Sequence, residues 1–104
     1  MSLADLDPVI HAPKRLAAMA ILVNSTTTDF GFLRDHLGLG DSDLSKQMAT
    51  LERAGYIEVS KTSRGRGGAT WYRVTADGTR AFRRHMAALD EIVRQTASAE
   101  ATAE

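Results

Sequence analysis

Residues 41–75 restrict the fold of this chain more than any other stretch, because a helical pattern there passes directly into two β-type segments. Leu44, Met48 and Leu51 recur at i, i+4 and i+7, which predicts a helix over residues 42–54 with one buried face. Steps of about 100° per residue place small polar and basic residues on the opposite side: Ser42, Ser45, Lys46, Ala49, Thr50 and Arg53. Such a face suits the base edges of a DNA major groove.

The second half of this stretch predicts a β-hairpin. Gly55 ends the helix, residues 56–61 and 71–74 alternate as strands, and residues 62–70 form the loop between them. Alternation assigns one set of side chains to the inner face, namely Ile57, Val59, Tyr72 and Val74. Trp71 and Arg73 then face outward, where Arg73 is placed to pair with Glu58 across the ladder.

The preceding residues predict a helix-turn-helix. Residues 14–23 are almost entirely apolar and form a central buried helix, and about three residues within 24–28 form a short strand. Asp29 caps a helix over residues 30–37, and Gly38 ends it in the left-handed conformation that glycine adopts readily. Asp41 and Ser42 then cap the next helix, so two short helices are joined by a tight turn.

The two ends of the chain predict a dimer. Residues 2–11 contain a helix signal at Asp7-Pro8, and Thr75 caps a last helix over residues 76–97. That helix would be about 33 Å long, more than the diameter of about 26 Å expected for a domain of this size. Its far end therefore needs a partner subunit, and the predicted interface residues are Leu3, Leu6, Phe82, Met86, Leu89, Ile92 and Val93. Residues 98–104 form an acidic tail that we expect to fray.

Composition fits one small globular domain over residues 1–97. The net charge of the 104 residues is zero, but residues 61–84 contain seven Lys or Arg residues and one Asp, a local charge of +6. A segregated charge of this kind favours a nucleic-acid partner. The absence of cysteine fits a reducing cytoplasm, and no apolar run or leader pattern indicates a membrane segment.

The order of elements resembles the winged-helix transcription regulators related to MarR, especially short dimeric regulators of this length, which include ArsR-like proteins. The resemblance is carried by residues 11–16, 29–33, 41–46, 51–57 and 71–75, of which Leu-Glu-Arg-Ala-Gly-Tyr-Ile at 51–57 and Trp-Tyr-Arg-Val-Thr at 71–75 are the most specific. It implies an α+β, mostly helical winged helix-turn-helix. It also implies a homodimeric bacterial repressor or activator on a near-palindromic site, and it leaves open a small-molecule effector.

We therefore expect a regulator that binds double-stranded DNA, with the helix in the major groove and the hairpin, or wing, on the flanking backbone or minor groove. The predicted DNA-binding residues are Ser42, Ser45, Lys46, Thr50, Arg53, Lys61, Arg64, Arg66 and Arg73. Winged-helix modules that bind proteins or RNA are the alternatives. No residue pattern indicates an enzyme, a cofactor or a metal site, although His11 and His85 could meet across the terminal helices.

Overall fold

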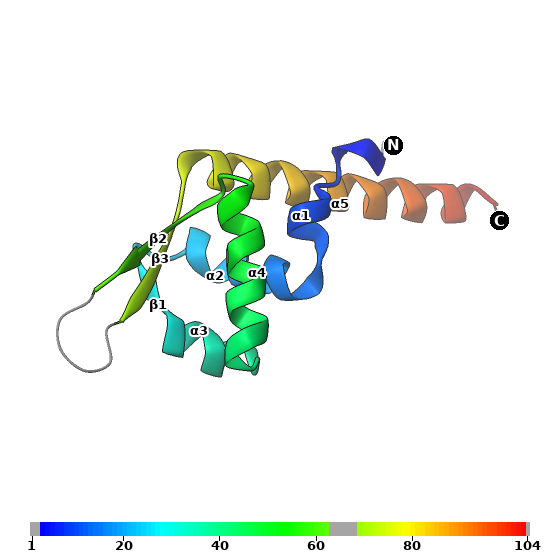
Figure 1. Ribbon diagram of the computed structural model, residues 1–104. Helices are drawn as coiled ribbons and strands as arrows, with labels where there is room; N and C mark the ends of the chain where they lie inside the picture. The colour runs from blue at the N-terminus through cyan, green and yellow to red at the C-terminus, as the bar shows by residue number, and fades with distance from the viewer. Residues whose placement is uncertain (1–2, 63–68, 104) are drawn as a thin grey trace.

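The computed structural model describes residues 3–62 and 69–103 (Figure 1). In chain order the elements are a 3-10 turn η1 (Leu3–Asp5), α1 (Pro8–His11), α2 (Pro13–Val23), β1 (Thr28–Asp29), α3 (Phe30–Leu37), α4 (Asp41–Arg53), β2 (Ile57–Lys61), β3 (Thr70–Val74) and α5 (Ala76–Ala103). The predicted α+β fold with a two-stranded hairpin, a short third strand and a long last helix is confirmed.

A single apolar core lies between the helices and one face of the sheet. The predicted inner face of α4 is confirmed, since Leu44, Met48 and Leu51 are all buried. They pack in one cluster with apolar residues from α1, α2, α3, the sheet and α5, namely Ile10, Ala18, Met19, Leu22, Leu33, Ile57, Tyr72 and Ala81. Burial of this inner face fixes which residues of α4 point to solvent.

The three strands form an antiparallel sheet in the order β1-β3-β2. Val59 lies opposite Tyr72, and Glu58 lies opposite Arg73, with which it forms the predicted ion pair. The third strand is shorter and later than expected, and consists of Thr28 and Asp29 alone. Ser25, which precedes this strand, does not pair with the sheet. Its amide and hydroxyl instead donate to backbone carbonyls at the end of α2.

The predicted cap of α4, at the turn between α3 and α4, is wrong. Gly38 ends α3 at φ 66°, as predicted, but α4 begins at Asp41 with Gly40 in the N-cap position. Asp41 and Ser42 therefore do not cap the helix. The carboxylate of Asp41 instead accepts a hydrogen bond from Arg34 at 3.2 Å, an interaction that links the two helices.

The start of α5 packs closely against the turn that precedes β2. Thr75 is the predicted cap: its hydroxyl accepts from the amide of Gly78 at 2.9 Å and donates to the carbonyl of Gly55 at 2.7 Å. A Cβ on Gly78 would overlap the carbonyl oxygen of Tyr56 and lie 2.9 Å from its carbonyl carbon. Glycine at this position thus permits the approach of α5 to the hairpin.

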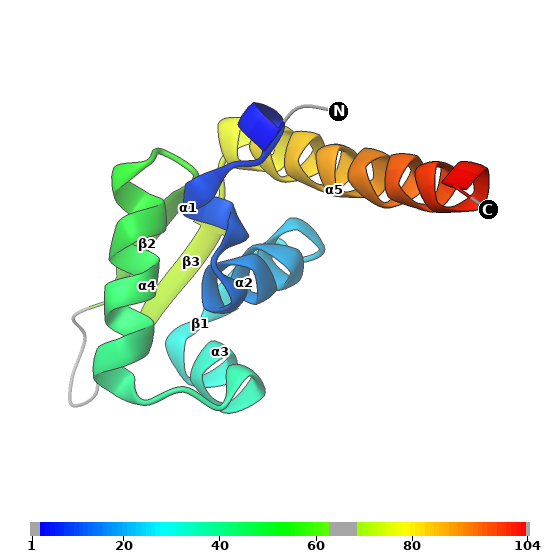
Figure 2. The same cartoon turned by 90° about the vertical axis from the view of Figure 1, so that its right-hand side faces the viewer.

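The terminal elements differ in length from the prediction. Residues 2–11 were expected to be helical, and the N-terminal segment forms η1 and α1. The predicted helix signal at Asp7-Pro8 is confirmed, because Asp7 caps α1, which begins at Pro8. The last helix continues past residue 97, where we expected a frayed tail, to Ala103. At 28 residues it is about 42 Å long, and its C-terminal half projects beyond the other elements in a molecule of 65 × 26 × 20 Å (Figures 1 and 2). Within the described ranges, no helix combines the length and apolarity needed to cross a membrane.

Candidate nucleic-acid interface

Three polar contacts hold the N-terminal half of α4 against its neighbours. The ammonium group of Lys14 lies 2.5 Å from the carboxylate of Asp43, and Arg15 donates to the side-chain oxygen of Gln47 at 2.7 Å. Arg34 forms the third contact, to Asp41. Both Asp residues of the first turn of α4 are thus paired with cations, which reduces the negative charge near the exposed face of the helix.

The outer face of α4 is where the sequence placed it. Ser42, Ser45 and Lys46 are not buried, and within the described part of the chain their side chains form no hydrogen bond or ion pair. Thr50 is less available, because it is half-buried and its hydroxyl donates to the carbonyl of Lys46 and accepts from Arg53. The polar side chains of this face that lack a partner among the described residues therefore lie in the first two turns of α4.

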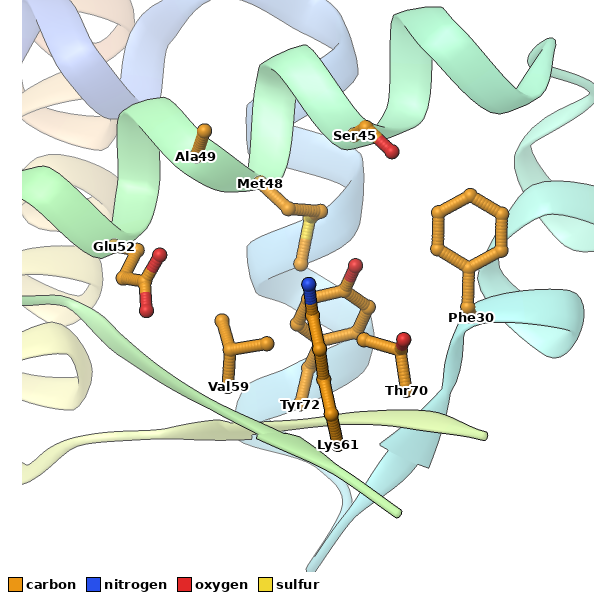
Figure 3. Close-up of a pocket in the computed structure, with 9 residues that line it drawn as sticks. All are labelled: Phe30, Ser45, Met48, Ala49, Glu52, Val59, Lys61, Thr70 and Tyr72. Carbon is orange, nitrogen blue, oxygen red and sulfur yellow. The ribbon is translucent and has the colours of Figure 1, made fainter. Parts of the chain in front are cut away.

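A groove of about 480 Å³ separates α4 from the hairpin (Figure 3). Its floor consists of Met48 and Tyr72, which are buried, and burial raises the pKa of the Tyr72 hydroxyl, with a smaller contribution from Glu52. Lys61 extends from β2 over this floor toward α4, and Ser45 lines the opposite side (Figure 3). The groove thus brings together one predicted DNA-binding residue of the helix, Ser45, and one of the hairpin, Lys61.

The remaining groove residues were not predicted as DNA-binding residues, although the sequence placed Ala49 on the outer side of the helix and Val59 on the inner face of the hairpin. They are Phe30, Ala49, Glu52, Val59 and Thr70. Ser45, Ala49 and Glu52 repeat at i, i+4 and i+7, so the helical period could have placed Glu52 on the same stripe as Ser45. No signal in the sequence predicts that Phe30 closes one end of the groove.

The hairpin divides its basic residues between two faces. Lys61 faces α4, whereas Arg73 lies on the opposite face of the sheet, where it pairs with Glu58 beside Trp71. Contacts between Thr62 and Ala69, including an amide-to-carbonyl bond of 2.9 Å, close the described end of the ladder. Arg64 and Arg66 lie outside the described residues.

The described basic residues within the segment 61–84 do not form one surface. Lys61 pairs with Thr70 at one end of the β2–β3 ladder, whereas α5 begins beyond the other end, after Val74 (Figure 1). Arg83 and Arg84 are exposed on α5, and Arg80 pairs with Asp77. These arginines therefore lie apart from Lys61 and the groove, although the sequence places them with Lys61 in one charged segment.

Comparison with known proteins identifies the family. The winged helix DNA-binding domain family matches residues 14–93, which span α2 through most of α5. The chain belongs to this family. None of the curated proteins compared with the sequence matches it significantly.

Solved structures share the winged helix fold at low sequence identity. A transcriptional regulator homologue from Pyrococcus horikoshii has a TM-score of 0.79 and 23% identity, over 85% of this chain and 87% of that one. A MarR-family regulator from Enterococcus faecalis has a TM-score of 0.68 and 20% identity, over 90% and 84% of the two chains. NolR from Sinorhizobium fredii has a TM-score of 0.63 and 24% identity, over 81% and 76%. In this fold α4 is the second helix of the helix-turn-helix, and β2 and β3 form the wing.

The predicted dimer residues of this winged helix protein fall into two groups. Leu3, Met86 and Val93 are exposed, with 69%, 42% and 64% of their surfaces accessible. Leu6, Leu89 and Ile92 are half-buried, and Phe82 is half-buried against the apolar core. The exposed apolar stripe on α5 therefore begins after Phe82, because Phe82 packs against the core.

The possible metal ligands are dispersed over the part of the chain that the structure describes. No three His, Asp or Glu side chains there lie close enough together to hold a metal ion. His36 is exposed and stacks on Phe32 at a ring-centroid distance of 5.0 Å. His11 and His85 do meet, as the sequence allowed, through ring nitrogens 3.2 Å apart.

Proposed function

We propose that this winged helix protein is a sequence-specific transcription regulator that binds double-stranded DNA as a homodimer. The observation that carries the proposal is the first half of α4, where Ser42, Ser45 and Lys46 remain accessible on a helix whose inner face is buried. Such a helix fits the major groove, where serine bonds to several base edges and lysine favours guanine.

Contacts to the DNA backbone come from the groove and the wing. Lys61 reaches toward α4, so a phosphate seated between the helix and the wing would meet its ammonium group (Figure 3). Arg64 and Arg66, which the sequence places at a glycine-rich tip, would extend these contacts to the flanking backbone or minor groove.

A homodimer would cover the exposed apolar side chains of α5. Met86, Leu89 and Val93 recur at i, i+3 and i+7 along the helix, and Leu3 adds an exposed apolar side chain from the N-terminal turn. Two-fold symmetry would then place the two α4 helices in successive major grooves, about 34 Å apart.

Selection from a random duplex library at physiological salt tests the proposal. We expect enrichment of a near-palindromic site with two half-sites separated by about one helical turn. Enrichment of structured RNA in a parallel selection would favour an RNA-binding module. Failure to enrich any nucleic acid would leave the winged helix as a protein-interaction scaffold.

A further inference from the structure

A buried histidine joins α5 to the N-terminal segment. His85 lies on α5, none of its surface is accessible, and both of its ring nitrogens have partners. Its Nδ1 accepts a hydrogen bond of 2.9 Å from the backbone amide of Asp7, the N-cap of α1. Its Nε2 lies 3.2 Å from Nδ1 of His11, the last residue of α1.

These contacts fix the protonation state of both rings. Because the amide of Asp7 can only donate, Nδ1 of His85 carries no proton, and the neutral ring holds its proton on Nε2. That proton is donated to Nδ1 of His11, which must then be unprotonated. A protonated Nε2 also leaves His85 unable to coordinate a metal at that nitrogen.

Asp7 extends the cluster to the wing. One carboxylate oxygen accepts from the amides of Val9 and Ile10, and so caps α1, while the other accepts from the hydroxyl of Tyr56 at 2.5 Å. The bond to Asp7 raises the pKa of Tyr56 to about 12, so the phenol remains a donor at neutral and acidic pH. His85, Asp7 and Tyr56 thus connect α5, α1 and the turn before β2.

We propose that the Asp7–His85–His11 cluster is an acid-sensitive latch that holds α1 on α5 only while the imidazole of His85 is neutral. Protonation of His85 would set its Nδ1–H against the amide of Asp7. This event replaces a hydrogen bond with two opposed donors at the buried ring of His85, which favours release of α1.

The surrounding charges do not offset this effect. Burial lowers the pKa of His85, His11 lowers it further, and Asp7 raises it by a smaller amount. The other charged groups on elements that pack against α5 are directed elsewhere. Asp5 of η1 is exposed, Lys14 pairs with Asp43, and Arg15 bonds to the carbonyl of Val9 and to Gln47. Arg84, next to His85 on α5, is exposed and, with Asp77, acts on Tyr56.

The sign of the pH dependence follows from the lowered pKa of His85. Released His85 titrates near its ordinary value of about 6.5, whereas latched His85 takes up its proton only at a lower pH. The latch is therefore at full strength above about pH 6.5 and weakens as the pH falls toward the latched pKa. Each proton taken up on release shifts the equilibrium up to about tenfold per pH unit.

Hydrogen exchange on the full chain tests the latch. We expect the opening of α1, measured at the amides of Val9, Ile10 and His11, to increase up to about tenfold per pH unit between about pH 6.5 and 5.5. The amide of Leu51 in α4 is the internal reference, and rates are corrected for intrinsic exchange. A constant ratio between the two helices from about pH 8 to about pH 5.5 would overturn the proposal, as would ¹⁵N spectra that place the proton of His85 on Nδ1.

Variants separate the latch from general acid sensitivity. In His85→Gln the side-chain amide retains one acceptor and one donor but does not titrate, so α1 should lose its pH dependence. His36→Gln, on exposed α3, is the matched control and should keep the dependence of the natural chain. Equal pH dependence in the two variants would contradict the latch. If His85→Gln does not fold, exchange in the unchanged chain still decides, and neither measurement requires DNA or a dimer.

Discussion

The ammonium nitrogen of Lys14, at the start of α2, lies 2.5 Å from a carboxylate oxygen of Asp43 in the first turn of α4. The second oxygen of Asp43 accepts from the side-chain amide of Gln47 at 3.0 Å, and Gln47 in turn accepts from Arg15. The carboxylate of Asp43 therefore links α4, the proposed recognition helix, to α2. Gln47 and Lys14, in that order, lower the pKa of Asp43, and Lys46 adds a smaller effect.

Titration of Asp43 should reveal these effects. We expect its pKa to rise in both Gln47→Ala and Lys14→Ala, and to rise less in Lys46→Ala, because each change removes a group that stabilises the carboxylate. Since the folded pKa is lowered, this interaction is at full strength above about pH 4 and disappears as the pH falls through the lowered value. Carboxyl ¹³C shifts followed against pH measure the change. An unmoved midpoint in Gln47→Ala would refute the assignment.

Substitution of Gly78 should destabilise the whole fold. In Gly78→Ala the new methyl group would overlap the carbonyl of Tyr56 and come within 2.9 Å of the Val74 side chain, so α5 must shift. We expect a decrease of about 1–3 kcal/mol in the free energy of unfolding, measured by urea denaturation.

Gly31 supplies the matched control for this change. A Cβ there would meet only side-chain atoms, Arg34 at 3.8 Å and Asp29 at 3.9 Å. Because alanine favours the helix, Gly31→Ala should increase the free energy of unfolding by about 0.5–1 kcal/mol. Comparable decreases in both variants would show that close packing at Gly78 is not the cause.

Local sequence patterns predicted the elements that depend on neighbouring residues. The buried residues of α4, the left-handed Gly38 and the Thr75 cap each rest on a few adjacent positions, and each is confirmed. The prediction that Asp41 caps α4 is wrong because its carboxylate accepts a hydrogen bond from Arg34, and Gly40 takes the N-cap position. The sequence shows the capping tendency of Asp41 but not the nearby guanidinium of Arg34, which holds it inside the first turn.

The site was less predictable because it depends on the packing of distant segments. Helical angles predict that Ser45 and Lys46 lie on the outer face. They cannot show that Lys61 and Phe30 line one groove with Ser45, since these residues come from three separate elements. The charge of residues 61–84 likewise suggests a single patch when only the sequence is considered. The hairpin instead separates Lys61, at one end of the ladder, from Arg83, which lies on α5 beyond the other end.

Ser45 and Lys46 should determine which bases are preferred. Replacement of either by alanine removes an accessible side chain from the first two turns of α4, and neither side chain has an intramolecular partner among the described residues. We expect a changed preference at one or two positions of the selected site, by about 1–3 kcal/mol for each base interaction that is removed. Competition binding with single-base variants of the site measures this. Uniform weakening across all sites would make these residues phosphate ligands.

The wing should contribute charge rather than sequence preference. Lys61 faces the groove, whereas Arg73 faces away and is paired with Glu58. Lys61→Ala should therefore reduce the slope of log affinity against log salt by about 0.9, while Arg73→Ala should leave it nearly unchanged. We predict a reduction of about 0.9 for each of Arg64 and Arg66 as well. Equal slopes in Lys61→Ala and Arg73→Ala would remove the groove from the interface.

A charge on the exposed stripe of α5 should dissociate the proposed dimer. Val93 has 64% of its surface accessible, so Val93→Glu should leave the fold of the subunit intact while it places a carboxylate in the interface. Sedimentation at micromolar concentration should show dimers for the natural chain and monomers for the variant. Gln95→Glu adds the same charge about 200° around the helix and should remain dimeric. A monomeric natural chain, or equal dissociation in both variants, would exclude this face. Weaker DNA binding by Val93→Glu, in which the α4 side chains are unchanged, would then show that tight binding requires two half-sites.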